Sequence, residues 1–184
     1  MPEQPTITTA RLALRPFQLE DSEALMTLIG VREVSDTMLI VPYPYTLQDA
    51  HGWINSRQAA YDEGMMVSFA ITGRENGVFM GGTGLTFGHE RAHDKGEIGY
   101  WIGVPFWGQG YVTEAVRAVI AYGFEQIGLN RIYASHFDFN PASGRVMQKA
   151  GMHYEGTLRG YYRKGECYIT ALMYAIVRAD WQPD

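Results

Sequence analysis

The sequence predicts a single domain of α/β (α+β) class, built on a mixed sheet, and three observations support this. Segments with the period-two alternation of strands occur before, between and after segments with the apolar spacing of helices. The chain has 184 residues, of which 46% are apolar, enough to form a hydrophobic core. No repeat, charge block or low-complexity linker interrupts residues 1–184, which we therefore expect to form one domain.

The strands are predicted from alternation and from the residues that end them. Leu12 and Leu14 alternate with less apolar residues until Pro16 ends the first strand. The glycines and polar residues of 73–77 predict a hairpin turn between the second and third strands. Strands are predicted over residues 12–15, 67–71, 78–87, 98–102, 131–137, 152–162 and 166–177.

The helices are predicted from apolar stripes and from residues typical of helix ends. Thr46 and Asp49 resemble a capping box, and Asn140 followed by Pro141 is typical of a helix start. Gly128 suits the end of the long third helix. Helices are predicted over residues 20–29, 46–63, 111–127 and 141–150.

Charge and cysteine content limit the classes of function. Fifteen Lys and Arg against twenty Asp and Glu give a net charge of −5, which argues against a nucleic-acid-binding protein and is compatible with a cationic substrate. One cysteine, Cys167, excludes an internal disulfide and a cysteine-only metal site. The polar N-terminus and the lack of long apolar runs predict no signal peptide and no membrane span, hence a cytoplasmic protein.

The strongest chemical motif is the glycine-containing turn at 103–115, between a strand and a long helix. Gly108 and Gly110 flank Gln109 and permit close backbone approach to a ligand. The free amides of the following helix turn are suited to a phosphate or diphosphate, although a turn that serves only packing is the alternative. The turn is not a dinucleotide-binding motif, because Thr113 stands where that motif would have its third glycine.

Several motifs occur together, in one order, along nearly the whole chain. They are Leu14-Arg15-Pro16-Phe17, Pro42-Tyr43-Pro44-Tyr45-Thr46, 97–103, the glycine turn, Gly128-Leu129-Asn130-Arg131-Ile132, 140–146 and Lys149-Ala150-Gly151-Met152. In this order they resemble the GNAT family of acetyl-CoA-dependent N-acetyltransferases. Within that family the chain is most similar to the branch that acetylates N-terminal amines of ribosomal proteins.

The resemblance implies a GNAT fold, with about six to seven strands flanked by about four helices. It also implies acetyl transfer from acetyl-CoA to a primary amine by direct attack in a ternary complex, without a metal. The acceptor would be a protein N-terminus, a polyamine or an aminoglycoside, and relatives suggest a homodimer. The cofactor-binding positions implied are Ile102, Gly103, Val104, Gly108, Gln109, Gly110, Tyr111, Val112, Thr113, Asn140 and Ser143.

Two residues are candidates for proton transfer. An alkylamine has a pKa of about 10, so a base must take its proton before it attacks. Glu97 lies on the strand beside the expected cofactor and is our candidate for that base; the alternative is a solvated glutamate. Ser143 is the candidate donor to the leaving thiolate, although a serine near a helix start often bonds the local backbone.

The family resemblance implies that Tyr43, Tyr45 and Trp53 wall the acceptor site. This suits a cationic amine, because aromatic faces attract cations. The alternative for Trp53 is a core position on its helix.

Two other functions remain open from the residues alone. His89 and His93 form an H-E-x-x-H pattern, which on a helix would make a zinc protease site, although the surrounding residues favour a hairpin loop. The second alternative is a regulatory domain that binds CoA without turnover.

Overall fold

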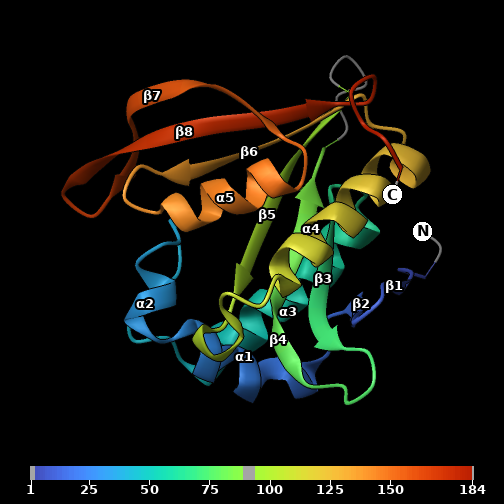
Figure 1. The fold of residues 1–184 in the computed structure, drawn as a ribbon. Coiled ribbons are helices and arrows are strands. Elements are labelled where there is room, and N and C mark those ends of the chain that lie inside the picture. The colour runs from blue at the N-terminus through green and yellow to red at the C-terminus, as the bar shows by residue number, and fades with distance from the viewer. Residues whose placement is uncertain (1–2, 89–93, 184) are drawn as a thin grey trace.

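A computed structural model describes residues 3–88 and 94–183 and contains one sheet with helices on both faces (Figure 1). The strands are β1 (Ile7–Thr8), β2 (Leu12–Pro16), β3 (Met66–Gly73), β4 (Phe79–Thr86), β5 (Lys95–Ile102), β6 (Arg131–Phe137), β7 (His153–Lys164) and β8 (Cys167–Val177). The helices are α1 (Ser22–Ile29), α2 (Arg32–Ser35), α3 (Leu47–Asp62), α4 (Tyr111–Tyr122) and α5 (Pro141–Lys149). This mixed architecture confirms the predicted fold class.

The sheet is split near its middle. Its strand order is β1-β2-β3-β4-β5-β6-β8-β7, and all neighbours are antiparallel except β5 and β6. These two parallel strands pair only between Lys95–Glu97 and Arg131–Tyr133. Beyond Glu97 they run apart, as Figure 1 shows, and leave a fork in the sheet.

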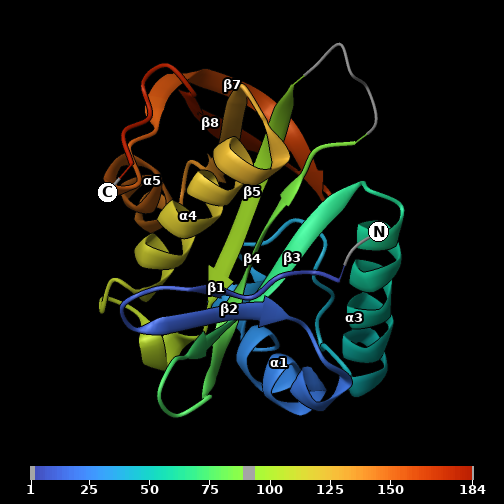
Figure 2. The ribbon, with the colours of Figure 1, turned by 90° about the vertical axis from the view of Figure 1, so that its right-hand side faces the viewer.

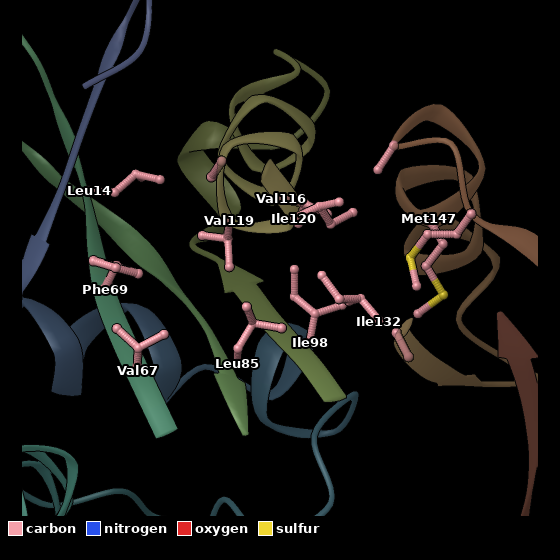
Figure 3. Close-up of a cluster of buried hydrophobic side chains, with 14 of the residues drawn as sticks. Leu14, Val67, Phe69, Leu85, Ile98, Val116, Val119, Ile120, Ile132 and Met147 are labelled. Carbon is pink, nitrogen blue, oxygen red and sulfur yellow. The ribbon is translucent and has the colours of Figure 1, made fainter. Parts of the chain in front are cut away.

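Helices α4 and α5 cover one face of the sheet, and α1 and α3 cover the other (Figure 2). The larger hydrophobic core lies under α4 and α5, where side chains of the sheet meet the buried stripe of α4 (Figure 3). Phe69, Leu85 and Ile132 are among its fully buried members. A second core, around Leu25 and Trp101, lies on the face of α1 and α3.

The helix ends follow the predicted signals. Thr46 accepts a hydrogen bond from the Asp49 amide at 3.2 Å, and the Asp49 carboxylate accepts one from the Thr46 amide at 2.8 Å, which completes the capping box. The Asn140 side chain accepts from the Ser143 amide at the start of α5. Helix α4 continues through a π-helical turn to Gly128, whose φ of +88° is favourable only for glycine.

The structure contains two short elements that the sequence did not predict. β1 has two residues and α2 has four, and both are too short to produce a periodic signal. The strand predicted over 98–102 ends at Ile102 as expected, and Val104–Phe106 then forms a 3₁₀ turn containing Pro105. The sheet therefore has eight strands and the described chain five α-helices, one more of each than predicted.

The described residues also bear on membrane and metal binding. Among residues 3–88 and 94–183, none of the helices is both long and apolar enough to cross a membrane. Within the same ranges, no cluster of three or more histidine, cysteine or acidic side chains is placed to hold a metal ion. His89 and His93 lie outside the described residues.

Candidate active site

A cleft of about 710 Å³ occupies the fork between β5 and β6. Its size is typical of small-molecule and cofactor sites. It is lined by β5, β6, the first turn of α4, the length of α5, the segment after α2 and Tyr162 of β7. Because the fork interrupts the sheet, the cleft contacts side chains from both of its faces.

Strand alternation assigns the lining residues to two sides. Ile98 belongs to the core under α4, so Tyr100 points to that side, whereas Glu97 points to the opposite face. On β6, His136 packs against Gly144 of α5, and Ser135 points to the same face as Glu97. The cleft thus has one side at α4 and α5 and another at α2.

The glycine turn forms the mouth of the cleft on the α4 side. Gly110 is the N-cap residue of α4 and has a φ of +80°, and it has no side chain with which to cap the helix. The first amides of a helix lack intrahelical partners, and the helix dipole adds positive potential there. Gly108, Gly110, Tyr111, Val112 and Thr113 line the cleft, which suits the binding of an anion such as a diphosphate.

Three of the predicted cofactor positions lie beside the cleft rather than on its wall. Gly103, Val104 and Gln109 are not among its lining residues. The side-chain amide of Gln109 donates a hydrogen bond to the Pro105 carbonyl at 3.0 Å. The remaining positions, from Ile102 to Ser143, contribute to the wall.

The backbone of Ile102 faces the fork. The Gly103 amide donates to the Met80 carbonyl of β4 at 2.9 Å, so the Ile102 carbonyl of the same trans peptide points the other way. That carbonyl accepts from the Trp107 indole at 2.8 Å. Trp107 therefore ties the glycine turn to the end of β5, a link that the sequence did not reveal.

A pair of hydroxyl groups links β5 to α5 across the fork. The Tyr100 hydroxyl lies 2.9 Å from the Ser143 hydroxyl and donates to the Ser143 carbonyl at 2.9 Å. Burial raises the pKa of Tyr100, and the bond to Ser143 offsets part of this rise. Tyr100 thus stays protonated at neutral pH and is a donor beside Ser143. Sequence reasoning missed it because its alternation on β5 resembled that of a core residue.

Glu97 lies where the two strands separate, on the side of α2. The residue keeps much of its surface exposed, yet neighbouring groups remove enough water from its carboxylate to raise its pKa. Burial raises the pKa of Tyr162, and the charge of Glu97 raises it further. The Tyr162 hydroxyl lies 2.9 Å from that of Ser135. Glu97, Ser135 and Tyr162 are the polar groups at this end of the cleft.

The aromatic residues expected on the acceptor side do not line the cleft. Trp53 packs edge-on against Phe17 at 4.8 Å between ring centroids, within the second core. Tyr43 is exposed. Tyr45 is partly buried, and this burial together with the charge of Asp49 raises its pKa to about 12. The wall of the cleft is formed instead by Val34 and residues 37–40.

Lys164, at the end of β7, holds this wall in place. Its ammonium donates to the backbone carbonyls of Ser35, Asp36 and Met38 at 2.9, 3.0 and 2.7 Å. These bonds use all three donors of the ammonium and satisfy carbonyls at the end of α2. The β7–β8 hairpin is thereby fastened to the segment that lines the cleft.

Replacing Lys164 with methionine should destabilise the protein. The three carbonyls would lose a charged donor, and since Lys164 is only half-buried we expect a loss of about 1–2 kcal/mol. For a chain of this size, that corresponds to a decrease in melting temperature of about 2–8 °C. The neighbouring Arg163→Met, at a mostly exposed side chain, serves as the control and should change it by less than about 2 °C. Equal shifts for the two variants would contradict the proposed clamp.

Comparison with known proteins agrees with this fold and cleft. The acetyltransferase (GNAT) domain model matches residues 11–153. The N-acetyltransferase YoaA of Bacillus subtilis is 33% identical over 177 residues, covering 95% of this chain and 97% of that protein. FsC-acetyl coenzyme A-N(2)-transacetylase of Aspergillus fumigatus is 31% identical, covering 97% of this chain and 78% of that protein.

A solved structure gives the same result. The GNAT-family acetyltransferase from Bacillus anthracis superimposes with a TM-score of 0.83 at 26% identity, covering 94% of this chain and 98% of that one. The matching domain places the protein among acyl-transferring enzymes. The chain belongs to the GNAT acetyltransferase family and is an N-acetyltransferase that depends on acetyl-CoA.

Proposed function

We propose that this enzyme transfers the acetyl group of acetyl-CoA directly to a primary amine, with both substrates bound at once. The observation that carries the proposal is the cleft that passes through the forked sheet. Its α4 side has an anion-binding helix start, and its α2 side has a carboxylate. Two substrates can thus reach the fork from opposite faces and be bound there at the same time. Direct transfer requires that both are held together.

Glu97 is proposed as the base that accepts the proton of the incoming amine, directly or through water. Its position at the point where β5 and β6 separate, on the face of α2, supports this role. Its raised pKa brings the carboxylate closer to the range in which a general base is effective.

Ser143 is proposed as the donor to the departing sulfur. As the amine nitrogen bonds to the carbonyl carbon, the carbon–sulfur bond breaks and the sulfur needs a proton. The Ser143 hydroxyl can supply it and regain a proton from water, which also accepts the proton held by Glu97; the Tyr100 hydroxyl, 2.9 Å away, positions Ser143. The proton removed at Glu97 and the proton gained by sulfur balance, so the reaction yields an amide and a thiol.

The acceptor is proposed to be a primary amine of a protein N-terminus or of a small molecule. A carboxylate beside two hydroxyl groups suits an ammonium group, which donates up to three hydrogen bonds. A relative named as an N(2)-transacetylase supports a nitrogen atom as the acceptor, and resemblance to the ribosomal branch supports a protein N-terminus.

The test combines thermal unfolding with thiol release. Acetyl-CoA at about 100 times its dissociation constant should stabilise the protein by about 2.7 kcal/mol, a shift of about 5–11 °C. An amine panel containing N-terminal peptides, polyamines and aminoglycosides should then yield free thiol and an acetylated product detected by mass. A thermal shift without thiol release from any amine would favour a regulatory CoA-binding domain, and no shift at all would contradict the proposal.

A further inference from the structure

The turn between β1 and β2 contacts the glycine turn through one arginine. The Arg11 guanidinium donates to a carboxylate oxygen of Glu114 at 2.7 Å and to the Gln109 carbonyl at 3.0 Å. It also lies over the Tyr111 ring, 4.4 Å from the centroid. Arg11 thus contacts three positions of the segment that forms the mouth of the cleft, although it is not itself a lining residue.

Glu114 creates an electrostatic difficulty for an anion-binding helix start. It is in the first turn of α4, where a carboxylate stabilises the helix but repels a bound diphosphate. Burial by itself would raise the pKa of Glu114, but hydrogen bonds from Thr9 and Arg11 outweigh it and lower the pKa. The carboxylate is therefore ionised at neutral pH and needs a counter-charge.

The geometry supplies that counter-charge from outside the cleft. Glu114 accepts from the Thr9 hydroxyl at 2.6 Å, from the Arg11 amide at 2.9 Å and from the Arg11 guanidinium. These bonds draw the carboxylate toward the β1–β2 turn. The same guanidinium donates a hydrogen bond to the Gln109 carbonyl, which turns this carbonyl toward Arg11. The backbone amides at the start of α4 then remain available to a ligand.

We propose that Arg11 is a positioning residue for the diphosphate of acetyl-CoA: it neutralises Glu114 and fixes the glycine turn in its anion-binding conformation. This inference rests on the proposed function. It concerns only the diphosphate part of the ligand, because the side-chain contacts of Arg11 described above are with Gln109, Tyr111 and Glu114, at the glycine turn and the start of α4.

The test compares donors with and without a diphosphate. For Arg11→Gln, we expect the KM for acetyl-CoA to rise about 10- to 30-fold, since a charge-assisted contact is lost and Glu114 is left unpaired. The KM for S-acetylpantetheine, which lacks the diphosphate, should change less than about twofold. Arg11→Lys restores the charge without the forked geometry and should give an intermediate value.

A second variant separates the electrostatic role from general damage. Adding Glu114→Gln to Arg11→Gln removes the unpaired carboxylate and should recover about three- to tenfold of the lost affinity for acetyl-CoA. Equal effects on both donors, or no effect on either, would overturn the inference. If Arg11→Gln fails to fold, Arg11→Lys is measured with both donors, and equal effects there would overturn it as well. Wild-type protein that does not bind acetyl-CoA would instead overturn the proposed function.

Discussion

Replacing Gly110 with valine should lower the affinity for acetyl-CoA about 100-fold. Gly110 has a φ of +80°, a conformation that a β-branched residue adopts only with strain of about 1–3 kcal/mol. The substitution would therefore shift the turn whose amides face the cleft, and its Cβ would lie 3.5 Å from the Arg11 guanidinium. Isothermal titration with acetyl-CoA measures the loss.

Gly128 provides a matched control at the opposite end of the same helical segment. Its φ of +88° imposes the same strain on a side chain, and no atom lies within 4 Å of the position of an added Cβ. Gly128→Val should thus lower the melting temperature by a similar amount while leaving acetyl-CoA affinity within about twofold of wild type. If both variants lose affinity equally, the glycine turn does not form the diphosphate site.

Replacing Glu97 with glutamine should lower kcat about 10²- to 10³-fold and leave acetyl-CoA affinity nearly unchanged. The magnitude is that of losing a general base, and the amide keeps the size of the side chain. Glu125→Gln, at a carboxylate outside the cleft, should retain full activity. A kcat for Glu97→Gln within about threefold of wild type would remove Glu97 as the base.

The pH dependence gives a second test of Glu97. A base must be ionised, so kcat/KM rises with pH through the pKa of Glu97 and falls when the carboxylate is protonated. Because burial raises this pKa above its ordinary value, the acidic limb should lie at higher pH than for an exposed glutamate. Glu97→Gln should lose this limb but keep the limb caused by the amine. An identical profile for both proteins would contradict the assignment.

The sequence predicted the elements whose signals are local. The Thr46–Asp49 capping box, the Asn140 cap and the Gly128 end were all predicted, because a cap depends on residues within one turn. The glycine turn before α4 was predicted for the same reason, and with it one side of the cleft. Elements of two to four residues, β1 and α2, were missed because alternation needs more residues to become visible.

The α2 side of the cleft depended on tertiary structure. Lys164 lies 126 residues from Met38, yet it fixes the segment that forms the cleft wall, and no local pattern indicates such a contact. Tyr100 reaches Ser143 only because β5 and α5 meet across the fork. For Trp53 the resemblance implied an acceptor contact and the helical spacing a core position, and the side chain packs against the second core.

The sequence by itself therefore determined the fold class, the family and the glycine turn at the start of α4. Only the tertiary structure decided which side chains meet in the cleft, because β5 and β6 pair for three residues and then separate. Strand alternation puts Glu97 on one face of the sheet and Tyr100 on the other, and the separation of the strands leaves both beside one cleft. Divergence of two strands is a property of how whole layers pack, and short-range residue patterns do not encode it.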